Sequence, residues 1–139
     1  MTSLTKRHFL ATAVAAPFLL RPAFAANPIT YAYSPGVIED ALRAGRTVVV
    51  EYHAFWCSVC RRQQRVFERL RTENIDYNRL YYVRVDWDEY RDFPVALDRD
   101  VFNRSTLLVL RGSEEIDRVV AATGVAKLRE FLDGALNSS

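Results

Sequence analysis

The stretch VVVEYHAFWCSVCR spans residues 48–61 and contains both cysteines of the 139-residue chain. Its first part is β-branched and mostly apolar, which predicts a strand over residues 47–54 that is buried on both faces. Cys57 and Cys60 follow at C-x-x-C spacing, and residues 57–72 carry apolar positions at helical intervals. The pattern therefore predicts a strand, a cysteine pair and a helix in direct succession.

The rest of the chain alternates between helical and strand patterns. Helices are predicted over residues 37–44 and 125–136, and further strands over residues 81–86, 106–110 and 115–121. The first half alternates in the way that produces parallel strands, whereas the last two strands form an antiparallel hairpin. We therefore expect an α/β fold with four strands, parallel in the first half and antiparallel in the hairpin.

The first 25 residues have the pattern of a cleavable export signal. Lys6 and Arg7 precede an apolar run over residues 9–20, and the small-x-small sequence Ala23-Phe24-Ala25 follows. The apolar run is too short to cross a hydrocarbon core of roughly 30 Å. We predict cleavage after Ala25, a periplasmic or otherwise exported location, and one domain over residues 26–139 without a membrane span.

The export route stays open, and so does one structural alternative. Residues 5–10 (TKRHFL) resemble a twin-arginine signal with Lys in place of the first Arg, but an ordinary secretory signal also begins with a basic pair. The alternative is a buried N-terminal helix. Residues 27–35 are polar, aromatic and proline-containing, and they predict an extended lead-in to the domain.

The composition favours a single globular domain and argues against a nucleic-acid partner. Half of the chain is hydrophobic and its formal net charge is +2. Residues 1–25 carry three of the 19 basic residues and none of the 17 acidic ones, so the remainder has a net charge of −1. No basic run supports binding to nucleic acid.

The position of Cys57 at a predicted helix start favours redox chemistry. Unsatisfied backbone N–H groups and the positive end of the helix dipole stabilise a thiolate there. A thiolate attacks disulfides, and Cys60 is close enough in the chain to resolve the mixed disulfide.

Three other interpretations of the cysteine pair compete with redox chemistry. A zinc site would need further ligands, but His53 is the only histidine after residue 25. A purely structural disulfide would close a very short loop, which restrains the unfolded chain weakly. The third interpretation is that the cysteine pairs of two chains in a dimer bind a metal ion or cluster. The strand–C-x-x-C–helix context favours the redox interpretation, and we expect no metal and no cofactor.

At these residues the sequence resembles the thioredoxin family. The resemblance rests on residues 48–61, with Trp56 directly before the first cysteine, and continues through VRVDWD at residues 83–88 and the hairpin to the final helix. It implies a thioredoxin-like fold, which is an α/β fold with a central mixed four-stranded sheet flanked by helices. It also implies thiol–disulfide exchange with protein thiols and disulfides. It also implies a Cys57–Cys60 disulfide couple in which Cys57 attacks and Cys60 resolves.

Three side chains on the predicted strands are candidate contributors to this chemistry. Glu51 stands six residues before Cys57, where the family has a buried acid that transfers protons to and from the resolving cysteine. Arg84 falls where the family often has a basic partner for that acid. His53 shares a strand face with Glu51, so it either tunes the disulfide or is a hydrogen-bonded core residue. The alternative for Glu51 is a partly solvated edge position.

The important departure from the family is Ser105. The family has a cis-proline before the strand equivalent to residues 106–110, but here residues 103–107 are NRSTL. A cis peptide before a residue other than proline costs about 2.5–4 kcal/mol, so we expect a trans bond or a strained one. The departure affects partner recognition more than cysteine chemistry, and it leaves the sulfurs more open with a hydroxyl nearby. Residues expected to bind clients or tune the pair are Trp56, Ser58, Val59, Ser105 and Thr106.

The motif does not decide the direction of electron flow. We expect an exported, monomeric thiol–disulfide oxidoreductase that acts as a reductant, with a membrane electron donor as a further partner. The alternative, motivated by Ser105, is a thioredoxin-like binding module whose disulfide only holds the loop. The sequence offers no dimerisation domain of the kind found in two-domain disulfide isomerases.

Overall fold

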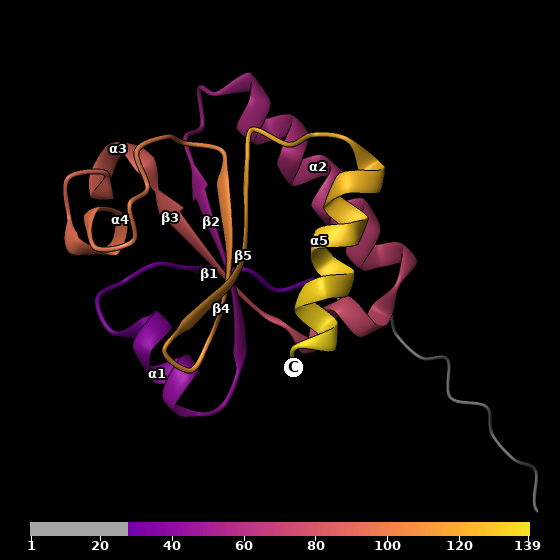
Figure 1. Ribbon diagram of the computed structural model, residues 1–139. Coiled ribbons are helices and arrows are strands. Elements are labelled where there is room, and N and C mark those ends of the chain that lie inside the picture. The colour runs from indigo at the N-terminus through magenta and orange to yellow at the C-terminus, as the bar shows by residue number, and fades with distance from the viewer. Residues whose placement is uncertain (1–27) are drawn as a thin grey trace, which may run out of the picture.

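The strand β2 (Thr47–His53) is buried at every residue and lies at the centre of the sheet in the computed structural model, which describes residues 28–139. It pairs in parallel with β3 (Tyr81–Asp86) and antiparallel with β4 (Thr106–Arg111). Helices cover both faces of β2, as Figure 1 shows, and this explains its continuous apolar sequence. The predicted strand and its mixed pairing are confirmed.

The sheet contains five strands within residues 28–139, so the expectation of four was wrong. Their order is β1-β3-β2-β4-β5, and β5 (Glu114–Val120) forms the predicted antiparallel hairpin with β4. The additional strand, β1 (Tyr31–Ala32), lies in the predicted lead-in and pairs in parallel with β3. Two residues are too few to carry a periodicity, so this strand is defined only by its pairing.

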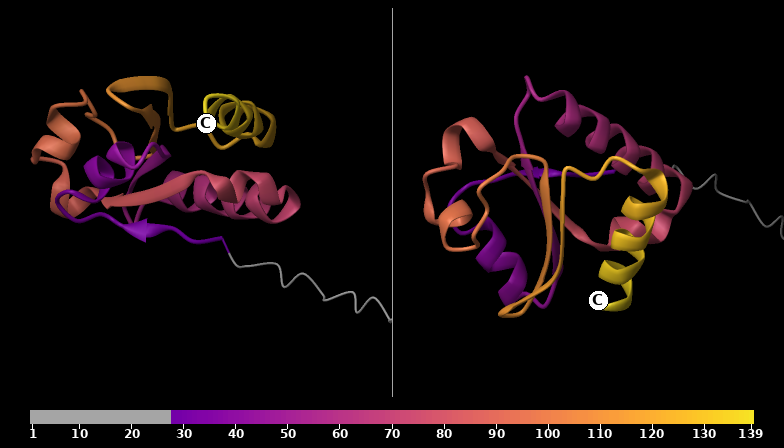
Figure 2. Two further views of the ribbon diagram at one scale, coloured as in Figure 1. Left: turned by 90° about the horizontal axis from the view of Figure 1, so that it is seen from below. Right: turned by 45° about the horizontal axis from the view of Figure 1, so that its top comes forward.

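Six helical segments form two layers around the sheet in the described part of the chain. On one side lie α1 (Val37–Arg43), α3 (Trp87–Tyr90) and α4 (Pro94–Leu97), as Figures 1 and 2 show. On the other side lie α2 (Ser58–Glu73), the 3₁₀ helix η1 (Ile75–Arg79) and α5 (Val125–Asn137). The three predicted helices are confirmed to within one residue at each end.

Each face of the sheet has its own core. Below α2 and α5 the buried side chains include Val49, Phe67, Leu70, Leu107, Leu128 and Phe131. Below α1 and α4 they include Ile38, Val48, Val50, Val83, Val95 and Leu108. Neighbouring residues of β2 and β4 therefore serve opposite cores, because side chains alternate along a strand. This double packing holds the C-terminal end of β2, where the cysteines follow, in a fixed place.

The buried side of α2 is more polar than its sequence suggests. Val59, which helical spacing groups with the core positions, is 37% exposed because the first turn of α2 extends past the sheet. Arg71 is buried instead, with its guanidinium 3.6 Å from the centre of the Tyr82 ring. Arg71 donates to Thr30 Oγ1 at 2.9 Å and to the Ile29 carbonyl at 2.6 Å, so it ties the lead-in to the domain.

The predicted export signal, residues 1–25, lies outside the described residues. Across residues 28–139, every helix is too short or too polar to cross a bilayer.

Candidate active site

Cys57 is positioned by the turn between β2 and α2. The backbone N–H of Cys57 donates to the Ala54 carbonyl at 3.1 Å, and Cys57 is the N-cap of α2 with φ −80° and ψ 113°. Its Sγ accepts a hydrogen bond from the backbone N–H of Cys60 at 3.2 Å. The first sulfur thus lies where unpaired N–H groups and the helix dipole favour an anion.

The two sulfurs differ in their access to solvent. Both are free thiols in this structure, with Cys57 5% exposed and Cys60 1% exposed. Cys57 lines an open hollow of about 350 Å³, and Cys60 is absent from its lining. The other lining residues are Val59, Asn103, Arg104, Ser105, Val120 and Ala121. A molecule that enters this hollow therefore reaches Cys57 and not Cys60.

The environment also shifts the pKa values of the two thiols in opposite directions. Burial raises the pKa of Cys57, but hydrogen bonds from Cys60 and Ser105 outweigh burial and lower this pKa to about 7. Burial and the hydrogen bond with Cys57 raise the pKa of Cys60. At neutral pH the pair therefore holds a large fraction of thiolate on Cys57 and a thiol on Cys60.

Ser105 lies against both sulfurs. Its Oγ is 3.4 Å from Cys57 Sγ and 2.9 Å from Cys60 Sγ, and the residue is 2% exposed. The described residues contain no cis peptide bond, and Ser105 has a left-handed backbone with φ 62°. The adjacent Thr106 is also buried, and its Oγ1 donates to the Asn103 carbonyl at 2.7 Å. Ser105 and Thr106, which lie in the segment that departs from the family sequence, are thus both buried in the site.

Glu51 and Arg84 form an ion pair, with Arg84 Nε 2.8 Å from Glu51 Oε2. Glu51 is buried, so the alternative of a solvated edge position does not apply. Within residues 28–139, no hydrogen bond joins either side chain directly to a sulfur. The pair lies on the α2 side of the sheet, where Glu51 and Arg84 line a shared cavity with Gln64 and Phe67.

The imidazole of His53 is buried, but its hydrogen-bonding capacity is not fully used. Its Nε2 has no hydrogen-bond partner among the described residues, and its ring stacks edge-on against Phe55 at 5.5 Å between centroids. Burial lowers the pKa of His53, although the nearby Glu51 carboxylate acts in the opposite direction. His53 also lines a cavity of about 250 Å³ with Arg84 and Asp86. It is therefore neutral at pH 7 and does not contact the sulfurs.

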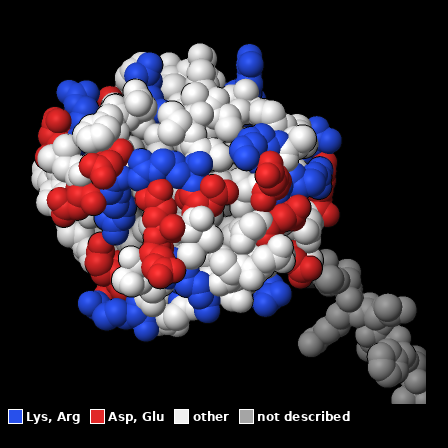
Figure 3. All heavy atoms as spheres, viewed as in Figure 1, with Lys and Arg blue, Asp and Glu red and all other residues white. Residues whose placement is uncertain are grey.

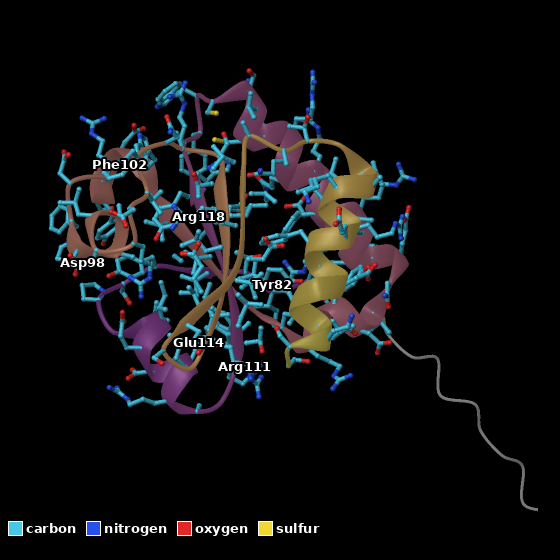
Figure 4. All side chains as sticks on the ribbon, in the orientation of Figure 1. Tyr82, Asp98, Phe102, Arg111, Glu114 and Arg118 are labelled. Atoms are coloured by element: carbon cyan, nitrogen blue, oxygen red, sulfur yellow. The ribbon has the colours of Figure 1, made fainter. Side chains whose placement is uncertain are left out.

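The remaining predicted residues lie on the surface around the pair. Trp56 is 56% exposed, and its Nε1 donates to Asp88 Oδ2 at 2.8 Å. Ser58 is exposed at the first position of α2. Figure 4 shows the sulfur atoms at the end of the sheet where α2 begins, and Figure 3 shows that the surface at this end is mostly uncharged.

Sequence reasoning missed Arg104 and Gln63. The Arg104 guanidinium lies 4.3 Å from the centre of the Trp56 ring and contributes to the lowered pKa of Cys57. Gln63 is buried, and its Nε2 donates to the carbonyls of Ser105 at 3.2 Å and Ala122 at 2.9 Å. Gln63 follows Cys60 by one helical turn, a spacing that could have revealed it. Arg104 could be found only from the folded path of the loop.

The described residues hold no group of three or more His, Cys, Asp or Glu side chains arranged to bind a metal ion.

Several characterised proteins are similar to this chain. Thioredoxin H5 from Oryza sativa is 31% identical over 83 residues, which cover 60% of this chain and 58% of the rice protein. Thioredoxin-2 from Saccharomyces cerevisiae is 30% identical over 99 residues, which cover 70% of this chain and 90% of the yeast protein. This chain thus spans less than two thirds of the rice relative and most of the yeast one.

A solved structure agrees with these sequence matches. The crystal structure of Trxlp from Edwardsiella tarda superimposes with a TM-score of 0.68 at 28% identity, covering 75% of this chain and 98% of that one. The thioredoxin family model matches residues 36–134, which include β2, both cysteines and the hairpin. On this match and on the geometry around Cys57 and Cys60, the chain belongs to the thioredoxin family.

Proposed function

We propose that this chain is an exported thiol–disulfide oxidoreductase that exchanges disulfides with protein partners through Cys57 and Cys60. One observation carries the proposal: Cys57 lines an open hollow and has a pKa lowered to about 7, whereas the buried Cys60 has a raised pKa. A thiolate is the attacking species in disulfide exchange, and a neighbouring thiol is needed to resolve the product. Family membership supports the same chemistry. The sulfurs hold the electrons, so the reaction needs no added cofactor.

The reaction proceeds in two steps, attack by Cys57 and resolution by Cys60. The Cys57 thiolate forms a bond to one client sulfur, and the other client sulfur leaves with the electron pair of the broken disulfide. Cys60 then loses its proton and attacks Cys57 Sγ, which releases the second client sulfur as a thiolate. We assign the carboxylate of Glu51 as the acceptor of the Cys60 proton, through water, because it is a buried carboxylate on the face of the sheet that α2 covers.

The acidity of Cys57 favours a reducing role. Strongly oxidising pairs stabilise their first thiolate so far that its pKa falls to about 3.5, whereas reducing pairs keep it near 7. The pKa of about 7 for Cys57 matches the second group. We therefore propose that this protein gives electrons to clients and regains them from a membrane donor.

The hollow beside Cys57 suits an extended segment of a client protein. Val59 and Val120 present apolar surface on its two sides, and Trp56 is exposed next to the first cysteine. The segment at residues 103–105 supplies the backbone between them. We propose that the monomer binds clients here mainly through apolar contact.

Insulin reduction by dithiothreitol tests the activity. The wild-type protein should accelerate precipitation of the reduced insulin chains, and Cys57→Ser should reduce the rate to that of dithiothreitol alone. Ser113→Ala, a change in the distant hairpin turn, is the matched control and should keep full activity. A wild-type rate equal to that of Cys57→Ser would favour the binding-module alternative and end the proposal.

A redox titration with glutathione tests the direction. We expect a potential below about −200 mV, the range of reducing members of this fold. A value near −120 mV would assign an oxidising role instead. Cys60→Ser should also retain client proteins as mixed disulfides that dithiothreitol releases, and capture of unrelated thiols in random yield would contradict the role of specific clients.

N-terminal sequencing of the protein from fractionated cells tests the export. The basic pair, the apolar run and Ala23-Phe24-Ala25 support a mature protein that begins at residue 26 outside the cytoplasm. Ala25→Arg should block processing and leave a longer product. An intact N-terminus on cytoplasmic wild-type protein would rule out the export signal.

A further inference from the structure

Ser105 is the one side chain among the described residues whose oxygen lies within hydrogen-bonding distance of both sulfurs. The Oγ is 2.9 Å from Cys60 Sγ and 3.4 Å from Cys57 Sγ. Ser105 and Cys60 are both almost completely buried, so water does not compete effectively for this hydroxyl. The site therefore has a hydroxyl where its family relatives, by the resemblance described above, have a proline ring that cannot donate a hydrogen bond.

The hydroxyl is held in place by the backbone of Ser105. The N–H donates to the Tyr52 carbonyl at 2.8 Å, and the carbonyl accepts from the Ala121 N–H at 2.9 Å and from Gln63 Nε2 at 3.2 Å. These contacts come from β2, from the end of β5 and from α2. They hold Ser105 at φ 62°, a conformation that a residue with a side chain adopts at an energetic cost. The backbone is thus constrained from three directions, and only the hydroxyl can rotate.

A hydroxyl has one proton to donate and two lone pairs to accept with. It can therefore stabilise the negative charge of only one sulfur at a time, while its oxygen faces the other. In disulfide exchange the charge moves: Cys57 is the thiolate before attack, and Cys60 becomes the thiolate during resolution. Rotation about a single side-chain bond is enough to redirect the proton between the two sulfurs.

We propose that Ser105 is a catalytic residue of the exchange reaction, whose hydroxyl donates first to the Cys57 thiolate and then, once Cys57 is bonded to the client, to the forming Cys60 thiolate. This inference rests on the proposed oxidoreductase function. Ser105 neither gains nor loses a proton overall. In the second step the Cys60 proton leaves through the path assigned to Glu51, the Cys60–Cys57 bond forms, and the client sulfur takes the electrons of the broken bond.

Other groups around the sulfurs have roles that can be distinguished from that of Ser105. Cys57 also receives hydrogen bonds from Cys60, and Arg104 helps to lower its pKa from the loop before β4. Cys60 faces Cys57, Ser105 and the backbone of Ala54. Ser105 lowers the pKa of both thiols, and Arg104 lowers that of Cys57, so Ser105 is placed to affect both steps.

Two substitutions separate the hydroxyl from the backbone. Ser105→Ala removes the hydroxyl and keeps the left-handed cost, whereas Ser105→Gly removes the hydroxyl and relieves that cost. If the hydroxyl acts as proposed, both variants share the same chemical defect although their stabilities change in opposite directions. Arg104→Gln is the matched comparison, because it weakens one contact to Cys57 and keeps the hydroxyl of Ser105 beside Cys60.

The first measurement is the pH dependence of Cys57 alkylation by iodoacetamide. The wild-type midpoint should lie near pH 7, and both Ser105 variants should shift it upward by roughly one unit, a tenfold loss of thiolate below the midpoint. An unchanged midpoint in both variants would overturn the proposal. A shift in Ser105→Ala that is absent in Ser105→Gly would assign the effect to the backbone and overturn it equally.

The second measurement follows the reaction with dithiobisnitrobenzoate, whose two coloured thiolates report attack and resolution separately. At pH 7 the first phase should slow roughly fivefold and the second roughly tenfold in the Ser105 variants, whereas Arg104→Gln should slow chiefly the first. A second phase of wild-type rate in both Ser105 variants would contradict the transfer to Cys60. The alkylation midpoint is independent of turnover on insulin, so failure of this inference is distinguishable from failure of the proposed function.

Discussion

The two faces of the sheet bury very different side chains. The face under α1 and α4 is apolar, and the hydroxyl of its large buried aromatic residue, Tyr52, donates to the Val95 carbonyl. The face under α2 and α5 buries an apolar core as well, but it also buries Glu51, His53, Gln63 and Arg71. Figure 4 shows Tyr82 on this second face, between the sheet and α5.

The difference shows how one strand can serve both stability and chemistry. Val50 and Tyr52 face the apolar side, and their neighbours Glu51 and His53 face the other side. Burying polar groups costs free energy unless they are paired. Glu51 is paired with Arg84, and Gln63 Nε2 donates to the Ser105 carbonyl, but Gln63 Oε1 has no hydrogen-bond partner among the described residues. The apolar face provides stability without such costs, so it offsets those of the face that carries the site.

The largest effect should come from opening a cavity in the apolar face. Leu108 is fully buried there, and Leu108→Ala should lower the free energy of unfolding by about 3 kcal/mol. The midpoint for Cys57 alkylation should stay near pH 7, because Leu108 does not touch the sulfurs. Urea unfolding and alkylation measure the two quantities. A midpoint shifted by more than half a pH unit would show that the two faces are not independent.

The next effect tests the ion pair on the other face. Glu51→Gln leaves the partly buried Arg84 without its anionic partner and should cost about 2 kcal/mol in the free energy of unfolding. It should also slow the second phase of the dithiobisnitrobenzoate reaction, because Glu51 is the assigned proton acceptor.

The matched control is Glu39→Gln, which breaks the pair with Arg99 at a carboxylate whose side chain is 47% exposed, against 10% for Glu51. It should cost no more than about 0.5 kcal/mol. Equal costs for Glu51→Gln and Glu39→Gln would mean that burial adds nothing to the Glu51–Arg84 pair.

The third prediction concerns pH. The pKa of Cys57 is lowered to about 7, so thiolate is present above pH 7 and is lost as the pH falls below it. The rate of attack on disulfides should fall about tenfold between pH 6 and pH 5, measured as the first phase of the coloured-thiolate release. Tyr52 on the apolar face has a pKa raised by burial and contributes nothing in this range. A flat rate down to pH 5 would contradict the assignment of Cys57 as the titrating nucleophile.

The smallest effect should come from His53. Its Nε2 is buried beside a cavity of about 250 Å³ and has no hydrogen-bond partner within residues 28–139, so an apolar ring of similar shape removes a desolvation cost. His53→Phe should raise the free energy of unfolding by up to about 1 kcal/mol, and His53→Gln should not raise it. Thermal unfolding measures the stability of each variant against that of the wild type. Destabilisation by His53→Phe would indicate that the imidazole makes an essential polar contact.

Much of the site could be predicted because its parts are adjacent in the chain. Cys57, Cys60 and Trp56 lie within one strand–turn–helix unit, and Glu51 and His53 follow from strand alternation. The pairing of Glu51 with Arg84 was anticipated from the family resemblance, and the register of β2 against β3 places the two residues opposite each other. The roles of these residues in exchange stay predictions.

Other contacts could not be predicted because they join segments far apart in the sequence. Gln63 contacts Ser105 and Ala122, and Arg104 packs on Trp56, through loops whose paths no local pattern encodes. The two-residue strand β1 likewise exists only through its hydrogen bonds to β3 and its anchorage by Arg71.

The sequence by itself therefore determined the central strand, the cysteine pair at the start of a helix and the α/β alternation, because these depend on local periodicity and on backbone geometry within a few residues. Only the tertiary structure decided that the hydroxyl of Ser105 lies against both sulfurs and that Cys57, not Cys60, faces the open hollow. The physical reason is that the loop before β4 reaches the cysteines only after β4 pairs with β2. That pairing brings Ser105 beside sulfurs that lie 48 and 45 positions away in the chain.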